Sequence, residues 1–119
     1  MQPGDTFLGG GEIHGADHLW LVLNNPAAHE ATALLVNLST LRPDAETTCI
    51  LRPGEHEFIT RDSYVRYRSA RAAKTADLEK LIKAGRLKLH RPASRDLFEK
   101  VRAGARASPQ LAAELKTLL

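Results

Sequence analysis

Short apolar runs that end in turn residues dominate the first half of the chain. Residues 18–23 are followed by Asn-Asn-Pro, and residues 33–38 are followed by Ser39-Thr40. Runs of this length are typical of strands that are buried on both faces of a sheet. We therefore predict two central strands, connected by a hairpin over residues 27–32.

Further segments extend this predicted sheet. Phe7-Leu8 marks an opening strand before a glycine-rich loop, and residues 47–51 precede a Pro-Gly turn. Residues 55–59 follow that turn, and residues 63–67 alternate apolar and polar side chains, as a half-exposed strand does. Five or six short strands at this spacing favour a small, curled antiparallel sheet or barrel.

The apolar pattern changes to the period of a helix in the second half. Thr75 can cap a helix that ends near Gly85, and Ser94 can cap a second helix. Ser108, which is followed by proline, marks the start of a third. The alternation of Leu87 and Leu89 indicates one more short strand between the first two helices.

Length and pattern together favour one domain of the α+β class. The chain has 119 residues, close to the commonest domain size, and contains no internal repeat or convincing linker. We expect a β-barrel core at about residues 4–70 and a helical part with two to three helices at about residues 75–119.

The charges are segregated along the chain. Residues 1–60 contain two Arg against eight carboxylates, a net charge of −6, whereas residues 61–119 contain fifteen Lys and Arg against six carboxylates, a net charge of +9. Such asymmetry attracts a polyanion or an acidic partner, although it also describes solvated helix faces. If the partner is a nucleic acid, the cations expected to hold its backbone are Arg66, Arg68, Arg71 and Lys74.

Several features favour the cytoplasm. No apolar run approaches the roughly 20 residues of a membrane-spanning helix, and the first residues lack the pattern of a signal peptide. The single cysteine, Cys49, has no partner in the chain and is expected to be reduced. The glycine-rich loop does not have the spacing of a nucleotide-binding motif, and we expect no cofactor and no membrane contact.

One set of side chains suits phosphodiester chemistry. His18 begins one central strand, and Ser39 and Thr40 end its neighbour. An imidazole can accept or give a proton near neutral pH, and hydroxyls can contact phosphate oxygens as charge develops. In RNA the 2′-hydroxyl is itself a nucleophile, so a metal is not obligatory. Alternatively, His18 ends a strand and the hydroxyls begin an ordinary turn.

A second set suits a metal or a thiol. His14, His18, Cys49 and His56 are potential zinc ligands, but they lack the close pairs of a zinc-finger pattern. Cys49 and His56 could also face each other across the Pro-Gly turn as a nucleophile and its base. The simpler interpretation is that Cys49 fills the core.

The order of these segments resembles the PemK/MazF toxin family. Gly4-Asp5 precedes the opening strand, residues 19–24 read LWLVLN, and residues 35–40 read LVNLST. The family typically shows Gly-Asp before a strand, then Arg-Pro-x-x-Val-Leu-Ser, then a strand that ends in Pro, an apolar residue, Thr and Ser. The segment from Ser63 to the following helix is also similar, so the resemblance spans about residues 4–84.

The resemblance implies an SH3-like barrel, a homodimer, and a metal-independent RNA endonuclease that an antitoxin protein neutralises. By position, Ser39 takes the place of the family's strand-end threonine, and His18 lies where its arginine would be. The family's Arg-Pro pair is replaced here by His18-Leu19, and the proline before the hydroxyls by Asn37-Leu38. The alternatives are a non-catalytic β-barrel module that binds nucleic acid or protein, and a small metal-binding protein that uses the Cys and His ligands.

Overall fold

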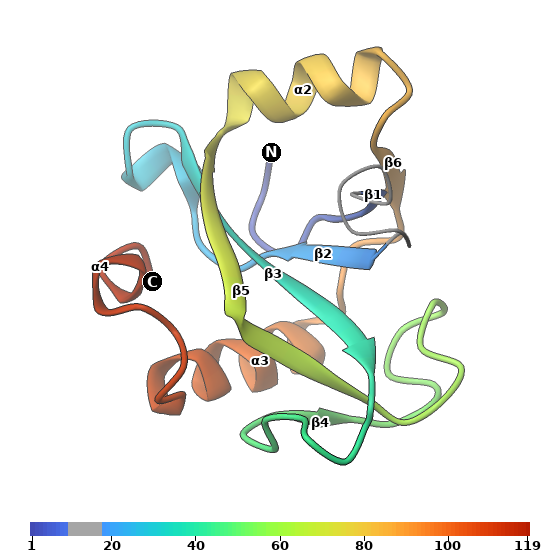
Figure 1. The fold of residues 1–119 in the computed structure, drawn as a ribbon. Helices are drawn as coiled ribbons and strands as arrows, with labels where there is room; N and C mark the ends of the chain where they lie inside the picture. The colour runs from blue at the N-terminus through green and yellow to red at the C-terminus, as the bar shows by residue number, and fades with distance from the viewer. Residues whose placement is uncertain (10–17) are drawn as a thin grey trace.

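The computed structural model describes residues 1–9 and 18–119, which form an α+β structure. Six antiparallel strands make a curled, half-barrel sheet in the order β4-β5-β3-β2-β1-β6, with helices packed around it (Figure 1). The strands are β1 (Thr6–Gly9), β2 (His18–Val22), β3 (Thr32–Thr40), β4 (Ile50–Leu51), β5 (Ser63–Lys74) and β6 (Lys88–His90). The helices are α2 (Thr75–Lys83), α3 (Arg95–Ala107) and α4 (Ala113–Lys116), and β2 is followed by the 3-10 turn η1 (Pro26–Ala28).

The ladder between β3 and β5 gives the sheet its curl. Leu35 pairs with Arg71 and Asn37 pairs with Arg66, so a single β3 residue lies opposite four residues of β5. An irregularity of this kind bends a strand and increases its twist. Because of this bend, β5 pairs with β3 on both sides of the irregularity, while the two halves of β5 run in different directions (Figure 1).

The two faces of the sheet bury separate apolar clusters. Alternate residues of a strand point to opposite faces, so Leu21 and Leu34 contact one cluster and Trp20 and Leu35 the other. The first cluster is covered by α3, whose Val101 is fully buried within it. The second cluster is covered by α2 and the segment that leads to β6. Both faces of the central strands are therefore apolar, as their continuous apolar runs predict.

Most of the strongly periodic elements were predicted correctly. The central strands β2 and β3, the opening strand β1 and the short strand β6 are all present. The Ser94 hydroxyl caps α3 by accepting a hydrogen bond from the Leu97 amide at 3.1 Å. Gly85, just beyond α2, has a positive φ of 76°, as a glycine that ends a helix often does.

The strand predicted over residues 55–59 is wrong. This segment forms bends and turns, because its side chains bond to nearby backbone groups. The Glu55 carboxylate accepts a hydrogen bond from the Arg52 amide, and the His56 ring accepts one from the Phe58 amide at 3.0 Å. Local bonds of this kind compete with a sheet ladder for the backbone. The strand predicted over 47–51 is shorter in the structure: only Ile50 and Leu51 pair with β5, and Cys49 adds one backbone hydrogen bond, from the Val65 amide to its carbonyl at 3.1 Å.

The C-terminal half also differs in detail from the prediction. Thr75 is the first residue of α2 and not its cap, since Lys74 holds the cap position. The Ser108 hydroxyl accepts hydrogen bonds from the amides of Gln110 and Leu111, so it closes a turn, and α4 begins only at Ala113. β6 pairs with β1, so the helical part also contributes an edge strand to the sheet. Among the described residues, no helix combines the length and the apolar character needed to cross a bilayer.

Candidate functional site

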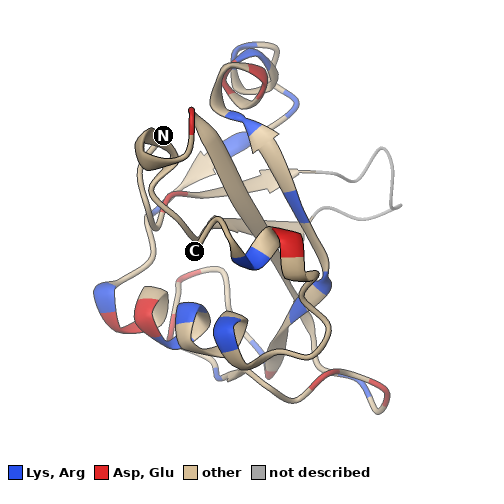
Figure 2. Ribbon diagram, turned by 90° about the vertical axis from the view of Figure 1, so that its left-hand side faces the viewer, with Lys and Arg blue, Asp and Glu red and all other residues tan. Residues whose placement is uncertain are grey.

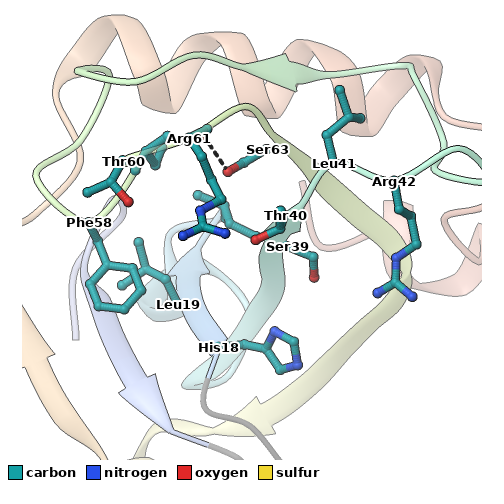
Figure 3. A pocket seen from close by; sticks show the side chains of 12 residues that line it. His18, Leu19, Ser39, Thr40, Leu41, Arg42, Phe58, Thr60, Arg61 and Ser63 are labelled. Atoms are coloured by element: carbon teal, nitrogen blue, oxygen red, sulfur yellow. Dashed lines mark hydrogen bonds between the residues drawn. The ribbon is translucent and has the colours of Figure 1, made fainter.

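A pocket of about 540 Å³ opens at the end of the half-barrel (Figure 3). The first residue of β2, the last residues of β3 and the first residue of β5 meet there, because antiparallel neighbours end at the same edge of a sheet. The segment 58–61, which leads into β5, forms the facing wall. Five apolar residues line the pocket: Leu19, Leu38, Leu41, Phe58 and Ile59. The rest of the lining is polar or charged and brings the candidate chemistry together.

His18 and Ser39, two of the predicted catalytic residues, face each other across β2 and β3. Leu19 pairs with Leu38, so His18 and Ser39 lie one position farther along the same ladder. Residues opposite each other on antiparallel strands share a face and have Cβ atoms about 5 Å apart. In Figure 3 the Ser39 hydroxyl points toward the His18 ring. The structure therefore brings an imidazole and a hydroxyl to the mouth of one pocket.

Thr40, the third predicted catalytic residue, lines the pocket but lies on the other face of β3. Successive residues of a strand alternate in direction, and Thr40 pairs with Ser63 of β5. Its hydroxyl points away from His18 and toward Arg61 in Figure 3. Thr40 can thus contact a molecule inside the pocket, whereas it does not face the imidazole as Ser39 does.

Two cations that line the pocket are not among the residues that the sequence predicts for the site. Arg42 follows the end of β3 by two residues, and Arg61 precedes the start of β5 by two residues. Both are exposed, and the ion pairs of the described residues involve Arg52, Arg91 and Lys100 but neither of these two guanidinium groups. The signal that could have found them is their position, since cations just beyond the paired ends of neighbouring strands reach the same rim.

A buried amide supports the rim hydroxyl from within. Asn37 is only 3% exposed, and its Oδ1 accepts a hydrogen bond of 3.4 Å from the hydroxyl of Ser39, which is itself buried. The length of this bond marks it as weak, so the hydroxyl can turn to another acceptor at low cost. Asn37 also pairs with Arg66, which places that cation next along the same face.

The four cations predicted to hold a nucleic acid all belong to β5, but they do not form one patch. Arg66 is two residues from the Tyr64 that pairs with Ser39 at the rim. Lys74, ten residues beyond Tyr64, is roughly 30 Å of strand away from it. The Lys74 ammonium donates hydrogen bonds to the Glu30 carbonyl at 3.1 Å and to Oγ1 of Thr32 at 3.0 Å, which fixes it at the far end of the sheet.

Arg71 and Arg68 lie between these extremes. The Arg71 guanidinium lies over the Trp20 ring at 5.3 Å from its centroid, a cation–π contact within the sheet face. Arg68 is exposed within the stretch where β5 bends away from β3. Of the predicted set, Arg66 is therefore the cation nearest to the pocket in register.

Cys49 lies in a closed environment, within the apolar cluster that α3 covers. It is 3% exposed, and its Sγ lies 4.0 Å from the Lys100 carbonyl of α3. Burial raises the pKa of the thiol, and this outweighs the hydrogen bond with Tyr67 and the charge of Lys100, which lower it. A raised pKa disfavours the thiolate that nucleophilic or metal chemistry requires.

His56 has a structural position. Its Nδ1 accepts the hydrogen bond from the Phe58 amide, so Nε2 carries the proton and donates to the Arg91 carbonyl at 2.6 Å. Both ring nitrogens are therefore engaged with the backbone, which leaves neither for Cys49. His14 lies outside the described residues. Within residues 1–9 and 18–119, no group of three His, Cys, Asp or Glu side chains is arranged to hold a metal ion.

Charge on the helices is mixed. In Figure 2 both α2 and α3 carry acidic as well as basic residues, whereas the charged residues of β5 are all basic. The net charge of +9 over residues 61–119 is thus spread over several elements. The concentrated chemistry of the described chain is at the rim pocket, where imidazole, hydroxyl and guanidinium groups meet.

Comparison with known proteins adds no relative. No family model, no curated protein and no solved structure matches this chain. Functional inference therefore rests on the residues of the pocket.

Proposed function

We propose that this chain is a metal-independent RNA endonuclease of the PemK/MazF kind, the toxin component of a toxin–antitoxin pair. The observation that supports the proposal is the meeting of His18, Ser39, Arg42 and Arg61 on one pocket at the open end of a curled sheet. The SH3-like form of the barrel and the homodimer belong to the same proposal, on the resemblance of residues 4–84. The charge of +9 over residues 61–119 suits both RNA and an acidic antitoxin.

The proposed reaction uses the RNA's own nucleophile. The His18 imidazole takes the proton of a ribose 2′-hydroxyl as the 2′-oxygen forms a bond to the adjacent phosphorus. The bond from phosphorus to O5′ breaks, and its electron pair stays on O5′, which takes a proton from water. The imidazolium then returns its proton to the solvent, so no proton is gained or lost. The products are a 2′,3′-cyclic phosphate end and a 5′-hydroxyl end.

The other polar groups of the pocket would stabilise the charge that develops on the phosphate. Arg42 and Arg61 stand on different sides of the pocket in Figure 3, so a phosphate between them would meet positive charge from both. Guanidinium groups suit this task because their planar donors match phosphate oxygens in pairs. The Ser39 hydroxyl, only weakly held by Asn37, can donate to a phosphate oxygen next to the imidazole.

The central test compares His18→Gln with the wild type on a mixed-sequence single-stranded RNA in the presence of EDTA. We expect the wild type to cleave and the variant to lose about 10²- to 10⁴-fold in rate, the usual contribution of a general base. His29→Gln is the matched control, because His29 lies beside η1, at the opposite end of β2 from the pocket. The same oligonucleotide as DNA should remain intact, since it has no 2′-hydroxyl.

Three results would contradict the proposal. Equal cleavage by His18→Gln and the wild type would remove His18 from the reaction. Cleavage of DNA at the rate of RNA would exclude the 2′-hydroxyl as nucleophile. Binding of RNA without any cleavage would leave a nucleic-acid-binding module, the alternative function. That binding should weaken steeply with added salt if phosphate contacts carry it.

A further inference from the structure

Phe58 is an exposed aromatic ring at the wall of the rim pocket. Its exposed fraction is 42%, and it lines the same pocket as His18 and Arg61. The other large apolar side chains that are exposed in the described residues, Leu81 and Leu89, do not line this pocket. A single exposed apolar residue is common on protein surfaces, so the position of Phe58 gains meaning only from what surrounds it.

The segment that carries Phe58 is held in place by a buried histidine. His56 is 6% exposed and accepts the Phe58 amide on Nδ1, while its Nε2 binds the Arg91 carbonyl, 35 residues away in the sequence. The Ile59 amide also donates to the His56 carbonyl at 2.9 Å. These bonds fix the backbone on both sides of Phe58. A ring held in this way loses little conformational entropy when a ligand stacks on it.

A second contact positions the ring itself. The His90 ring of β6 meets Phe58 edge to face, with centroids 5.5 Å apart and an interplanar angle of 62°. An edge-to-face contact of this geometry is favourable and leaves much of the aromatic surface uncovered. Figure 3 shows the Phe58 ring at one side of the pocket, with Leu19 between it and His18.

The pocket has the size and lining that suit a planar base. Its volume of about 540 Å³ lies in the range of sites for small organic molecules, about 300–1,000 Å³. Leu19, Leu38 and Ile59 give apolar surface beside Phe58, and the hydroxyls of Thr40 and Thr60 can bond to the edge of a base. Aromatic side chains with nearby hydrogen-bonding groups are the usual means of holding unstacked RNA bases.

We infer that Phe58 stacks with a base of single-stranded RNA, next to the phosphate that lies between Arg42 and Arg61. The inference rests on the proposed function, because it places the base in the same pocket as the reacting phosphate. It makes Phe58 a binding residue whose contribution is to hold the strand across the pocket. Since every base has a π-face, stacking alone gives affinity with little sequence preference, and the pocket hydroxyls would supply the preference.

The test measures binding separately from cleavage. In the His18→Gln background, a short fluorescein-labelled single-stranded RNA is titrated by fluorescence anisotropy with Phe58→Ala, Phe58→Leu and Phe58→Trp variants. We expect Phe58→Ala to weaken binding about 5- to 150-fold, the effect of losing one base–aromatic stack. Phe58→Trp should retain tight binding, whereas Phe58→Leu, which keeps apolar surface without a ring, should resemble Phe58→Ala.

Leu89→Ala is the matched control, since Leu89 is 57% exposed but lies outside the pocket, and it should bind as the parent does. Unfolding midpoints verify that each variant is folded. Wild-type affinity in Phe58→Ala, or equal affinity in the Leu and Trp variants, would overturn the inference even if the wild type cleaves RNA. A loss restricted to Phe58→Ala and Phe58→Leu would support it even if the wild type does not cleave, in which case only the proposed nuclease fails.

Discussion

Two regions of this molecule each bring a reactive side chain together with a hydroxyl. Under α3, Cys49 lies beside Tyr67, and at the rim pocket His18 faces Ser39. The first pair is sealed, since Cys49 is 3% and Tyr67 1% exposed. In the second pair Ser39 is also largely buried, at 6% exposed, but His18 is only half-buried, and the pocket that both residues line also contains two exposed guanidinium groups. Two similar pairs of side chains therefore differ in their surroundings: one lies inside the apolar core, and the other borders a pocket.

The difference shows that surroundings decide what a reactive residue can do. Burial is the main cause that raises the pKa of both Cys49 and Tyr67, so both stay neutral. The Tyr67 hydroxyl donates a hydrogen bond of 2.7 Å to the Val101 carbonyl, which ties β5 to α3. The buried contact between Tyr67 and α3 thus stabilises the fold. The rim pocket, in contrast, can be reached by a ligand and contains positive charge and a hydroxyl that is only weakly hydrogen-bonded.

The largest expected effect concerns the stability of the buried region, and it follows from adding a side chain at Gly104. A Cβ added there would collide with the Tyr67 hydroxyl and lie 3.0 Å from Cβ of Cys49, so α3 would have to move away from β5. We expect Gly104→Ala to lower the free energy of unfolding by about 1–3 kcal/mol, measured by urea denaturation. Helix propensity alone favours alanine by about 1 kcal/mol, so an unchanged or higher stability would contradict the close contact. Ala103→Ser, at an exposed neighbouring position, should have little effect.

A smaller effect is expected at Glu55, which holds the segment before Phe58 against α3. Burial by itself raises the pKa of the Glu55 carboxyl. Hydrogen bonds from the Lys100 ammonium and the Arg52 amide, together with the positive charges of the Lys100 and Arg52 side chains, outweigh burial and lower the pKa overall. The Lys100 ammonium lies 2.9 Å from Oε1 of Glu55. A lowered pKa in the folded state stabilises the protein above the carboxyl's unfolded pKa, and this stabilisation is lost as the pH falls through the folded value.

Glu55→Gln should therefore reduce stability at pH 6 by less than about 1 kcal/mol, in the range of surface ion pairs, and by less still at pH 3. Urea midpoints of variant and wild type at the two pH values measure this difference. Glu79→Gln, on the exposed face of α2, serves as the control. A penalty that is equal at both pH values would show that the ionised carboxylate is not the stabilising group.

The smallest effect should follow the removal of the thiol. Cys49→Ala should cleave RNA within about twofold of the wild type, because the buried thiol lies under α3 and not at the rim. A thiol reagent should also modify native Cys49 far more slowly than it modifies Cys49 in urea. Rapid labelling of the native protein, or lost cleavage in a folded Cys49→Ala, would remove the distinction between the two regions.

Sequence periodicity was most informative where an element is long or has a local signal. β2 and β3 follow from their apolar runs, and α3 follows from the Ser94 cap. The segment 55–59 was misassigned because its conformation depends on Glu55 and His56 bonding outside a ladder, to partners that the sequence does not reveal. The order of the strands predicts that His18 and Ser39 lie side by side. That the Thr40 side chain points to the other face of β3 follows only from the strand register in the structure.

By itself, the sequence determined the local and periodic properties of this protein: an α+β chain with two central apolar strands, a helix capped by Ser94 and positive charge in its second half. Only the tertiary structure decided that Arg42, Arg61 and Phe58 meet His18 at one rim, and that Cys49 is sealed beneath α3. The physical reason is that apolar spacing and caps act within a few residues. Register, bulges and the paths of loops are set by contacts between segments that lie far apart in the chain.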